Sequence, residues 1–180
     1  MAESSRPPWR CKQTGTARPP GAVAPAGAIV TDGADRRRYP DRPIVGVGAV
    51  IWRGDEVLLI RRGTPPMLGE WSLPGGRQHL GETVHACALR EVLEETAVTA
   101  EILALVDVVD AIRRDAEGKV EYHYTLVDLV GRWRAGQPRA GDDASDAAFH
   151  PLAALEGLGL WSETLRVIHA AYRIAAGGAP

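Results

Sequence analysis

A chain of 180 residues, 45% hydrophobic and 24% charged, is long enough for one globular domain with its own core. Its formal net charge of −2 gives no reason to expect binding to nucleic acid or to an anionic membrane. Two cysteines without CxxC spacing exclude a disulfide framework and a cysteine zinc site.

The N-terminus lacks the apolar core of a secretory signal, and no apolar run is long enough to cross a bilayer. These features and the sparse cysteines predict a cytoplasmic protein. A transit peptide is the less favoured alternative, because the prolines near the N-terminus oppose an amphipathic helix.

Residues 1–40 are rich in Pro, Ala, Gly and Arg, with little hydrophobic periodicity. Such a segment buries too little apolar surface to offset the entropy of ordering it, which predicts a disordered extension. Residues 26–30 are its one candidate strand. Residues 41–176 are predicted to form the folded domain.

The domain shows alternating strand and helix patterns. A continuous apolar run at 44–52 and a second run at 57–62 predict a buried strand pair joined by a turn. The remaining expected elements are a loop at 63–70, a short strand running into a loop at 71–76, a helix at 82–96, long strands at 102–112 and 120–130, a loop at 134–146, a short strand or turn at 147–152 and a helix at 161–176. Strands on both sides of a central helix, with a closing helix, favour an α/β/α sandwich.

Three carboxylates gather in one turn of the central helix. Glu94 and Glu95 lie about −60° and +40° around the helix from Glu91, so all three share one sector. Like charges at this spacing repel, and a divalent cation such as Mg²⁺, with Mn²⁺ as an alternative, would relieve the repulsion. The Gly76 carbonyl can serve as a further ligand, and Arg90 can hold a carboxylate in place. A solvated acidic face is the less favoured alternative.

The same stretch resembles the Nudix box. Gly76 is followed after five residues by Glu82, and seven more residues lead to Arg90-Glu91. The pattern is completed by an aliphatic residue, one further residue, Glu94-Glu95 and, at its end, the aliphatic Val98. The resemblance covers about residues 43–175 and implies a Nudix-type α/β/α sandwich with a mixed β-sheet. Two positions depart from it: Ala97 replaces the final glycine, at a cost of roughly 1 kcal/mol in a left-handed conformation, and His79 stands where many members carry an extra Glu.

The resemblance implies hydrolysis of a nucleoside diphosphate linked to another moiety. By position, Glu94 and Glu95 should be metal ligands and Glu91 a ligand or the base, with Arg90 orienting Glu91 and Glu82 supporting the site. Some Nudix enzymes take a further ligand or base from the loop after the fourth long strand. Asp143 is the candidate here, with Asp142 and Asp146 behind it. Ordinary loop polarity is an equally weighted reading of Asp142 and Asp143.

Substrate contacts are harder to predict. Arg61 and Arg62 point to opposite faces of a strand, and we name Arg61 as the candidate for substrate phosphate. Trp71 can stack on a base, although a structural role is favoured. Tyr124 can contribute to a nucleobase or ribose platform, with strand packing as the default.

An ADP-ribose-like substrate is favoured, because the flanking segments resemble the ADP-ribose pyrophosphatase-like branch. A nucleoside triphosphate pyrophosphohydrolase is the alternative. A non-catalytic nucleotide-binding regulator is less favoured, because all four box glutamates and Arg90 are present. The expected partner is a small nucleoside diphosphate derivative, without nucleic acid or membrane, and a homodimer is left open.

Overall fold

The computed structural model describes residues 37–64, 67–141 and 143–177. Most of the extension predicted at 1–40, its candidate strand at 26–30 and the candidate Asp142 therefore lie outside the described residues.

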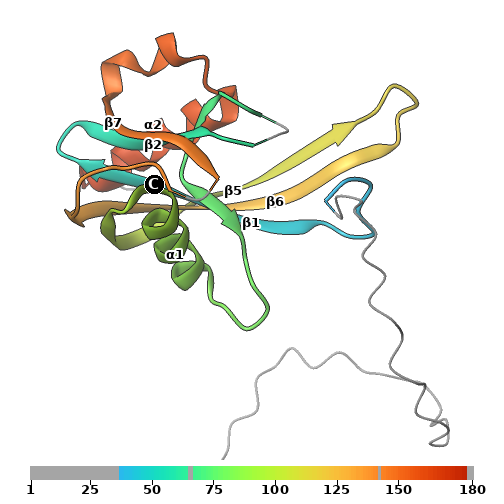
Figure 1. The fold of residues 1–180 in the computed structure, drawn as a ribbon, viewed down its shortest axis with the longest axis horizontal. Coiled ribbons are helices and arrows are strands. Elements are labelled where there is room, and N and C mark those ends of the chain that lie inside the picture. Colours follow the sequence, from blue (N-terminus) through green and yellow to red (C-terminus); the bar gives the residue numbers. More distant parts are fainter. Residues whose placement is uncertain (1–36, 65–66, 142, 178–180) are drawn as a thin grey trace, which may run out of the picture. The chain divides into compact units, whose positions relative to one another are not determined.

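Seven strands and three helical segments follow one another in the described part of the chain (Figure 1). In chain order they are β1 (Ile44–Arg53), β2 (Glu56–Arg62), β3 (Trp71–Ser72), β4 (Gly75–Arg77), α1 (Val84–Thr96), β5 (Thr99–Arg114), β6 (Val120–Ala135), β7 (Ala144–Pro151), the 3₁₀ segment η1 (Leu152–Leu158) and α2 (Ser162–Ala175). The predicted elements occur in the predicted order, but β4 lies where a loop was expected and η1 was not predicted. The pair β5–β6 is longer than predicted, because cross-strand pairing carries both strands past their apolar centres, from Thr99–Ala135 to Arg114–Val120. Pairing with β2 likewise makes β7 a strand of eight residues, with a register shift between Arg61 and Arg62 of β2.

The sheet is mixed, as predicted. Its main order is β3-β2-β1-β6-β5, with β4 paired to β1 and β7 paired to β2. Only β1 and β6 run parallel, in register from Ile44–Tyr124 to Trp52–Arg132, and the other pairs are antiparallel. Along the edge opposite β6, strand β1 pairs with two strands. Gly46–Gly48 pair with β4, and Trp52–Arg53 pair with β2.

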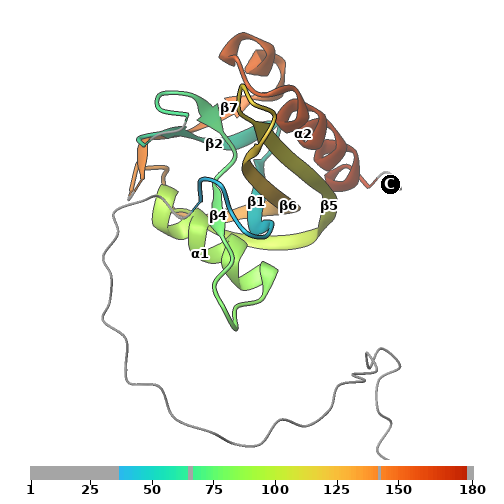
Figure 2. The ribbon, with the colours of Figure 1, turned by 90° about the vertical axis from the view of Figure 1, so that its right-hand side faces the viewer.

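The two long helices cover opposite faces of this sheet, which confirms the α/β/α sandwich (Figures 1 and 2). The alternation of side chains along β1 builds both cores. Ala49 and Ile51 pack in a cluster with Cys87, Ala88 and Val92 of α1. Val50 and Trp52 pack in a second cluster with Val167, Ile168 and Ala171 of α2.

Helix α1 begins two residues later than predicted. The Thr83 hydroxyl accepts a hydrogen bond from the Ala86 N–H at 3.1 Å and caps the helix. At the other end Ala97 adopts the left-handed conformation (φ 56°, ψ 19°), as predicted for the position where the box has glycine. The loop before β7 covers this end, since the Gly141 N–H donates to the Glu95 carbonyl at 3.1 Å. None of the described helices is long and apolar enough to cross a membrane.

Candidate active site

Arg90 is the centre of an ionic cluster on α1. Its Nε and Nη2 atoms donate to the two carboxylate oxygens of Glu82 at 2.8 and 3.0 Å. Its Nη1 donates to Glu91 at 2.7 Å and to Glu94 at 3.0 Å. Arg90 thus contacts Glu91 as the sequence predicted, and the planar guanidinium fixes three carboxylates at once.

Glu82 supports this cluster from the loop before α1. Besides its paired bonds to Arg90, its carboxylate accepts a hydrogen bond from the His79 N–H at 3.0 Å. The Arg90 guanidinium, and after it the His79 N–H, lower the pKa of Glu82 to about 2. Glu82 is therefore a permanent anion at physiological pH, suited to anchoring Arg90 rather than to exchanging protons.

The two glycines of β4 let the backbone approach the carboxylates of α1. A Cβ at Gly76 would collide with the carboxylate of Glu91, which lies directly against this glycine. The Gly75 N–H donates to Glu95 Oε2 at 2.9 Å. Since Gly75 and Gly76, which we call the glycine loop, also pair with β1, this part of the backbone is fixed between β1 and α1.

Glu95 is a buried carboxylate, with 6% of its surface exposed. Burial raises its pKa to about 7, opposed by the Gly75 hydrogen bond and Arg62 and reinforced by the charges of Glu91 and Asp143. A buried anion near other anions is unfavourable unless a cation joins it. This arrangement is what a divalent cation would stabilise.

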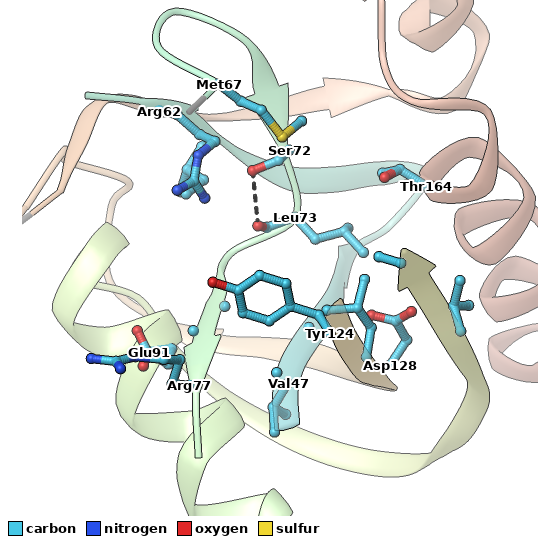
Figure 3. A pocket seen from close by; sticks show the side chains of 18 of the residues that line it. Val47, Arg62, Met67, Ser72, Leu73, Arg77, Glu91, Tyr124, Asp128 and Thr164 are labelled. Atoms are coloured by element: carbon cyan, nitrogen blue, oxygen red, sulfur yellow. Dashed lines mark hydrogen bonds between the residues drawn. The ribbon is translucent and has the colours of Figure 1, made fainter. Parts of the chain in front are cut away.

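Glu91, Glu95 and Asp143 line one end of a cavity of about 460 Å³, which we call the acidic end. Figure 3 shows Glu91 and Arg62 on one side of this cavity, and Asp128 and Thr164 on the other. Gly76, Arg62 and Tyr124 line the same cavity. The structure thus brings five of the predicted positions together: Gly76, Glu91, Glu95, Tyr124 and Asp143.

Asp143 is held at the acidic end by its backbone. The Gly63 N–H donates to the Asp143 carbonyl at 2.6 Å, directly after Arg62 in β2. A Cβ on Gly63 would be 2.7 Å from that carbonyl oxygen, so the close approach depends on glycine. The neighbouring candidate Asp146 instead uses Oδ1 to accept a hydrogen bond from the Ala147 N–H, and it does not line the cavity.

Glu94 is not turned into the cavity. Its side chain is 43% exposed and its carboxylate contacts Arg90. Within residues 37–64, 67–141 and 143–177, no three His, Cys, Asp or Glu side chains converge closely enough to form a complete metal centre. The carboxylates at the acidic end, from Glu91, Glu95 and Asp143, nonetheless supply oxygen, which is the ligand type that Mg²⁺ prefers, and Gly76 lines the same cavity. The residues therefore fit a hard divalent cation, and Glu94 would join them by turning from Arg90.

The two predicted arginines are placed on opposite sides, and the cavity receives Arg62 rather than the named candidate Arg61. Arg61 is exposed and donates from Nε to the Gly69 carbonyl at 2.8 Å. Arg62 lines the cavity, and its buried Nε has no hydrogen-bond partner among the described residues. A buried guanidinium N–H without a partner is available for an anionic ligand.

Trp71 does not line the cavity. Its ring packs edge-on against His150, with centroids 4.6 Å apart, and joins the α2-side core. This placement matches the structural alternative that the sequence favoured for Trp71.

Asp128, which was not among the predicted site residues, lines the cavity from β6. Tyr124, Leu126 and Asp128 alternate along this strand toward the cavity, and Val130 continues the same face into the α2-side core. A charged residue at an inward position of an alternating strand is the signal that could have identified Asp128. Trp161, Glu163 and Thr164, at the start of α2, line the cavity beside it and carried no comparable sequence signal.

Comparison with known proteins agrees with this geometry. The family model described as NUDIX domain matches residues 42–171. The chain is 36% identical over 110 residues to an ADP-ribose pyrophosphatase of Methanocaldococcus jannaschii, covering 61% of this chain and 63% of that protein, which is less than two thirds of its length. It is 41% identical over 101 residues to a putative 8-oxo-dGTP diphosphatase 2 of Mycobacterium tuberculosis, covering 55% of this chain and 67% of that one.

A similar solved structure is a MutT NUDIX hydrolase from Burkholderia pseudomallei. It superposes with a TM-score of 0.63 and 30% identity, over 72% of this chain and 98% of that chain. The likeness therefore extends over nearly the whole of a solved protein of this fold.

Proposed function

Because the chain belongs to the NUDIX family, we propose that it is a divalent-cation-dependent pyrophosphohydrolase that cleaves the diphosphate of a nucleoside diphosphate linked to a second group. The observation that carries this proposal is that the carboxylates of Glu91, Glu95 and Asp143 line the same cavity as Gly76. Carboxylate oxygens in one cavity with Arg62, whose Nε has no hydrogen-bond partner among the described residues, suit the binding of a diphosphate together with a metal ion.

The metal is proposed to be Mg²⁺, with Mn²⁺ as an alternative, held by Glu91, Glu95 and the Gly76 carbonyl, with Glu94 as a further ligand. When bound, such an ion neutralises phosphate charge and lowers the pKa of water. Arg62 would bind a phosphate oxygen through its unpaired Nε. Arg90 and Glu82 would keep Glu91 in position, and Asp143 would accept the proton of the attacking water.

An ADP-ribose-like substrate is favoured by the resemblance to the Methanocaldococcus jannaschii protein, which is named an ADP-ribose pyrophosphatase. The second candidate is a nucleoside triphosphate, because the Mycobacterium tuberculosis relative is named a putative 8-oxo-dGTP diphosphatase. A non-catalytic regulator is disfavoured, because Glu82, Arg90, Glu91 and Glu95 form a connected site around the glycine loop. A cytoplasmic location and a homodimer stay predictions.

A product-resolved screen tests the proposal. The purified chain is incubated with Mg²⁺, with Mn²⁺ or with excess chelator, and offered ADP-ribose, NADH, diadenosine polyphosphates and nucleoside triphosphates. AMP with ribose 5-phosphate from ADP-ribose identifies the favoured reaction. A nucleoside monophosphate with pyrophosphate from a triphosphate identifies the second candidate. Full turnover in excess chelator, or no cleavage of any substrate with either metal, would rule the proposal out.

A further inference from the structure

The cavity continues well beyond the acidic end. Its distal end is lined by Asp128 of β6, by Trp161 just before α2, and by Glu163, Thr164 and Val167 of α2. Figure 3 shows Asp128 and Thr164 on this side of the cavity. The walls between the two ends are largely apolar and come from β5 and β6, including Val109, Ala111, Tyr124 and Leu126. A pocket with largely apolar walls and a few polar groups is the usual form of a site that orients a small organic ligand.

In the described part of the chain, the carboxylate of Asp128 has no hydrogen-bond donor. Asp128 is 6% exposed, and no described residue donates a hydrogen bond to its side chain. The nearby cation Arg166 is engaged elsewhere, donating to Glu163 and to Asp107 at 2.7 Å each. Buried polar groups in native proteins nearly always have partners, so a carboxylate that faces a cavity without a donor from the described residues is open to the N–H or O–H donors of a ligand or of water.

Gly48 provides the space in which this carboxylate lies. A Cβ at Gly48 would collide with Asp128 Oδ1 and would lie 3.8 Å from the Leu73 side chain. Gly48 pairs with Asp128 on one side and with Gly75 on the other. The carboxylate therefore lies over β1, on the line from β6 to the glycine loop.

Two strand spacings, about 10 Å, separate the backbone of Asp128 from that of Gly75. A sugar and a base attached to a phosphate at the acidic end can bridge this span.

We propose that Asp128 binds the non-phosphate end of the substrate by accepting hydrogen bonds from two adjacent N–H or O–H donors. This inference rests on the proposed function, which places the phosphates at the acidic end. An ionised carboxylate is an acceptor only, and its two oxygens match a pair of parallel donors. Two substrate groups present such a pair: the amide and amine edge of a guanine-type base, and the vicinal hydroxyls of a ribose.

The same carboxylate excludes other ligands. A group that presents only carbonyl oxygens or a further phosphate to Asp128 meets repulsion in a buried site. A site built to hydrogen-bond a substrate donor also rejects an analogue that lacks the donor, because the carboxylate is then left buried and unpaired. Asp128 is therefore a specificity-determining residue, distinct from the groups at the acidic end.

The contact between Asp128 and the substrate is tested by removing one hydrogen-bond donor from the substrate and, separately, the negatively charged acceptor from the protein. Wild type and Asp128→Asn are compared on GTP and ITP, which lacks the 2-amino group, and on ADP-ribose and its analogue with a distal 2-deoxyribose. Asp110→Asn is the matched control, since Asp110 is exposed on the adjacent strand and does not line the cavity.

The wild type is expected to prefer the donor-complete member of one pair at least tenfold in kcat/KM, mainly through KM. Asp128→Asn should remove that preference with less than a threefold change in kcat, and Asp110→Asn should keep it. Loss of preference in the GTP pair identifies a base contact, and loss in the ADP-ribose pair identifies a sugar contact. If Asp128→Asn retains the wild-type preference, or the wild type shows none in either pair, the inference is wrong.

Calorimetric binding separates this inference from the proposed function. If the wild type cleaves none of the four compounds, the same ligands are titrated with Mg²⁺ into both proteins, while the wider substrate screen decides whether the proposed reaction itself fails. A preference in binding that Asp128→Asn abolishes would support the Asp128 contact without catalysis. Equal binding by both proteins, or no binding of any ligand, would overturn it.

Discussion

Replacing Asp128 by Asn should make the protein more stable at neutral pH. Burial raises the pKa of Asp128 from its ordinary value near 3.8 to about 6, and the charge of Asp107 on β5 adds to the effect. Arg166 on α2 opposes it, and Glu163 of α2 lines the same cavity. The folded state then holds the proton more tightly than the unfolded state. The free energy of unfolding therefore falls as pH rises from about 4 to about 6 and stays low above that window.

The magnitude follows from the shift. Roughly two pKa units at about 1.4 kcal/mol each give a cost of about 3 kcal/mol for the ionised carboxylate. Asn keeps the shape and cannot ionise, so the variant should exceed the wild type by about this amount at pH 7.5 and match it near pH 4. The test is how the difference in free energy of unfolding between the variant and the wild type changes with pH. The size of that difference at a single pH also includes the cost of the unpaired Asn amide.

Urea unfolding followed by tryptophan fluorescence at pH 4.5, 5.5 and 7.5 measures the difference, since Trp52 lies in the core. Asp110→Asn should change the free energy of unfolding by less than about 0.5 kcal/mol at each pH. A stability gap between wild type and Asp128→Asn that does not widen from pH 4.5 to 7.5 would refute the reasoning.

Three further predictions concern the acidic end and the end of α1. Glu94→Gln and Glu95→Gln should each lower kcat by at least about a hundredfold, or roughly 2.7 kcal/mol, while circular dichroism shows an intact fold; near wild-type turnover in either would remove that ligand from the proposed set. Asp143→Asn should reduce kcat strongly and flatten the pH dependence of kcat, with little change in KM. Asp146 lies outside the cavity, so Asp146→Asn should behave as wild type. Equal pH profiles for the two variants would leave Glu91 as the preferred base. Ala97→Gly should raise the free energy of unfolding by up to about 1 kcal/mol without affecting turnover, because Ala97 holds φ 56°; a destabilised variant would show that the left-handed conformation carries no strain.

The parts of the site that are local in sequence could be predicted from sequence. Glu82, Arg90 and Glu91 belong to one loop and one helix, so their spacing alone brings them together. The left-handed conformation of Ala97 could be predicted for the same reason, since it depends only on where α1 ends.

Features that depend on long-range pairing could not be predicted in this way. The alternation of a strand separates Arg61 from Arg62, but only the packed sheet decides which of them faces the cavity. The position of the Asp128 carboxylate depends on Gly48, eighty positions earlier in the chain. The register of β1 with β6 places this glycine beside the carboxylate, and sequence spacing does not reveal that register. Glu94 was expected to turn inward with its neighbours, and its contact with Arg90 depends on side-chain competition that spacing does not reveal.

The parallel pairing of β1 with β6 has a consequence for how the chain folds during synthesis. Ile44 pairs with Tyr124, and closing a loop of that length costs about 4 kcal/mol of chain entropy before any contact is gained. The apolar segment Ile44–Arg53 leaves the ribosome long before β6, so the edge of β1 that pairs with β6 stays unpaired until β6 is synthesised. A stretch so rich in Val and Ile is prone to pair with other chains in that interval. Slow translation between β1 and β6 should therefore favour aggregation, and the yield of soluble protein should depend on synthesis rate and chaperone supply more than on the stability of the finished fold.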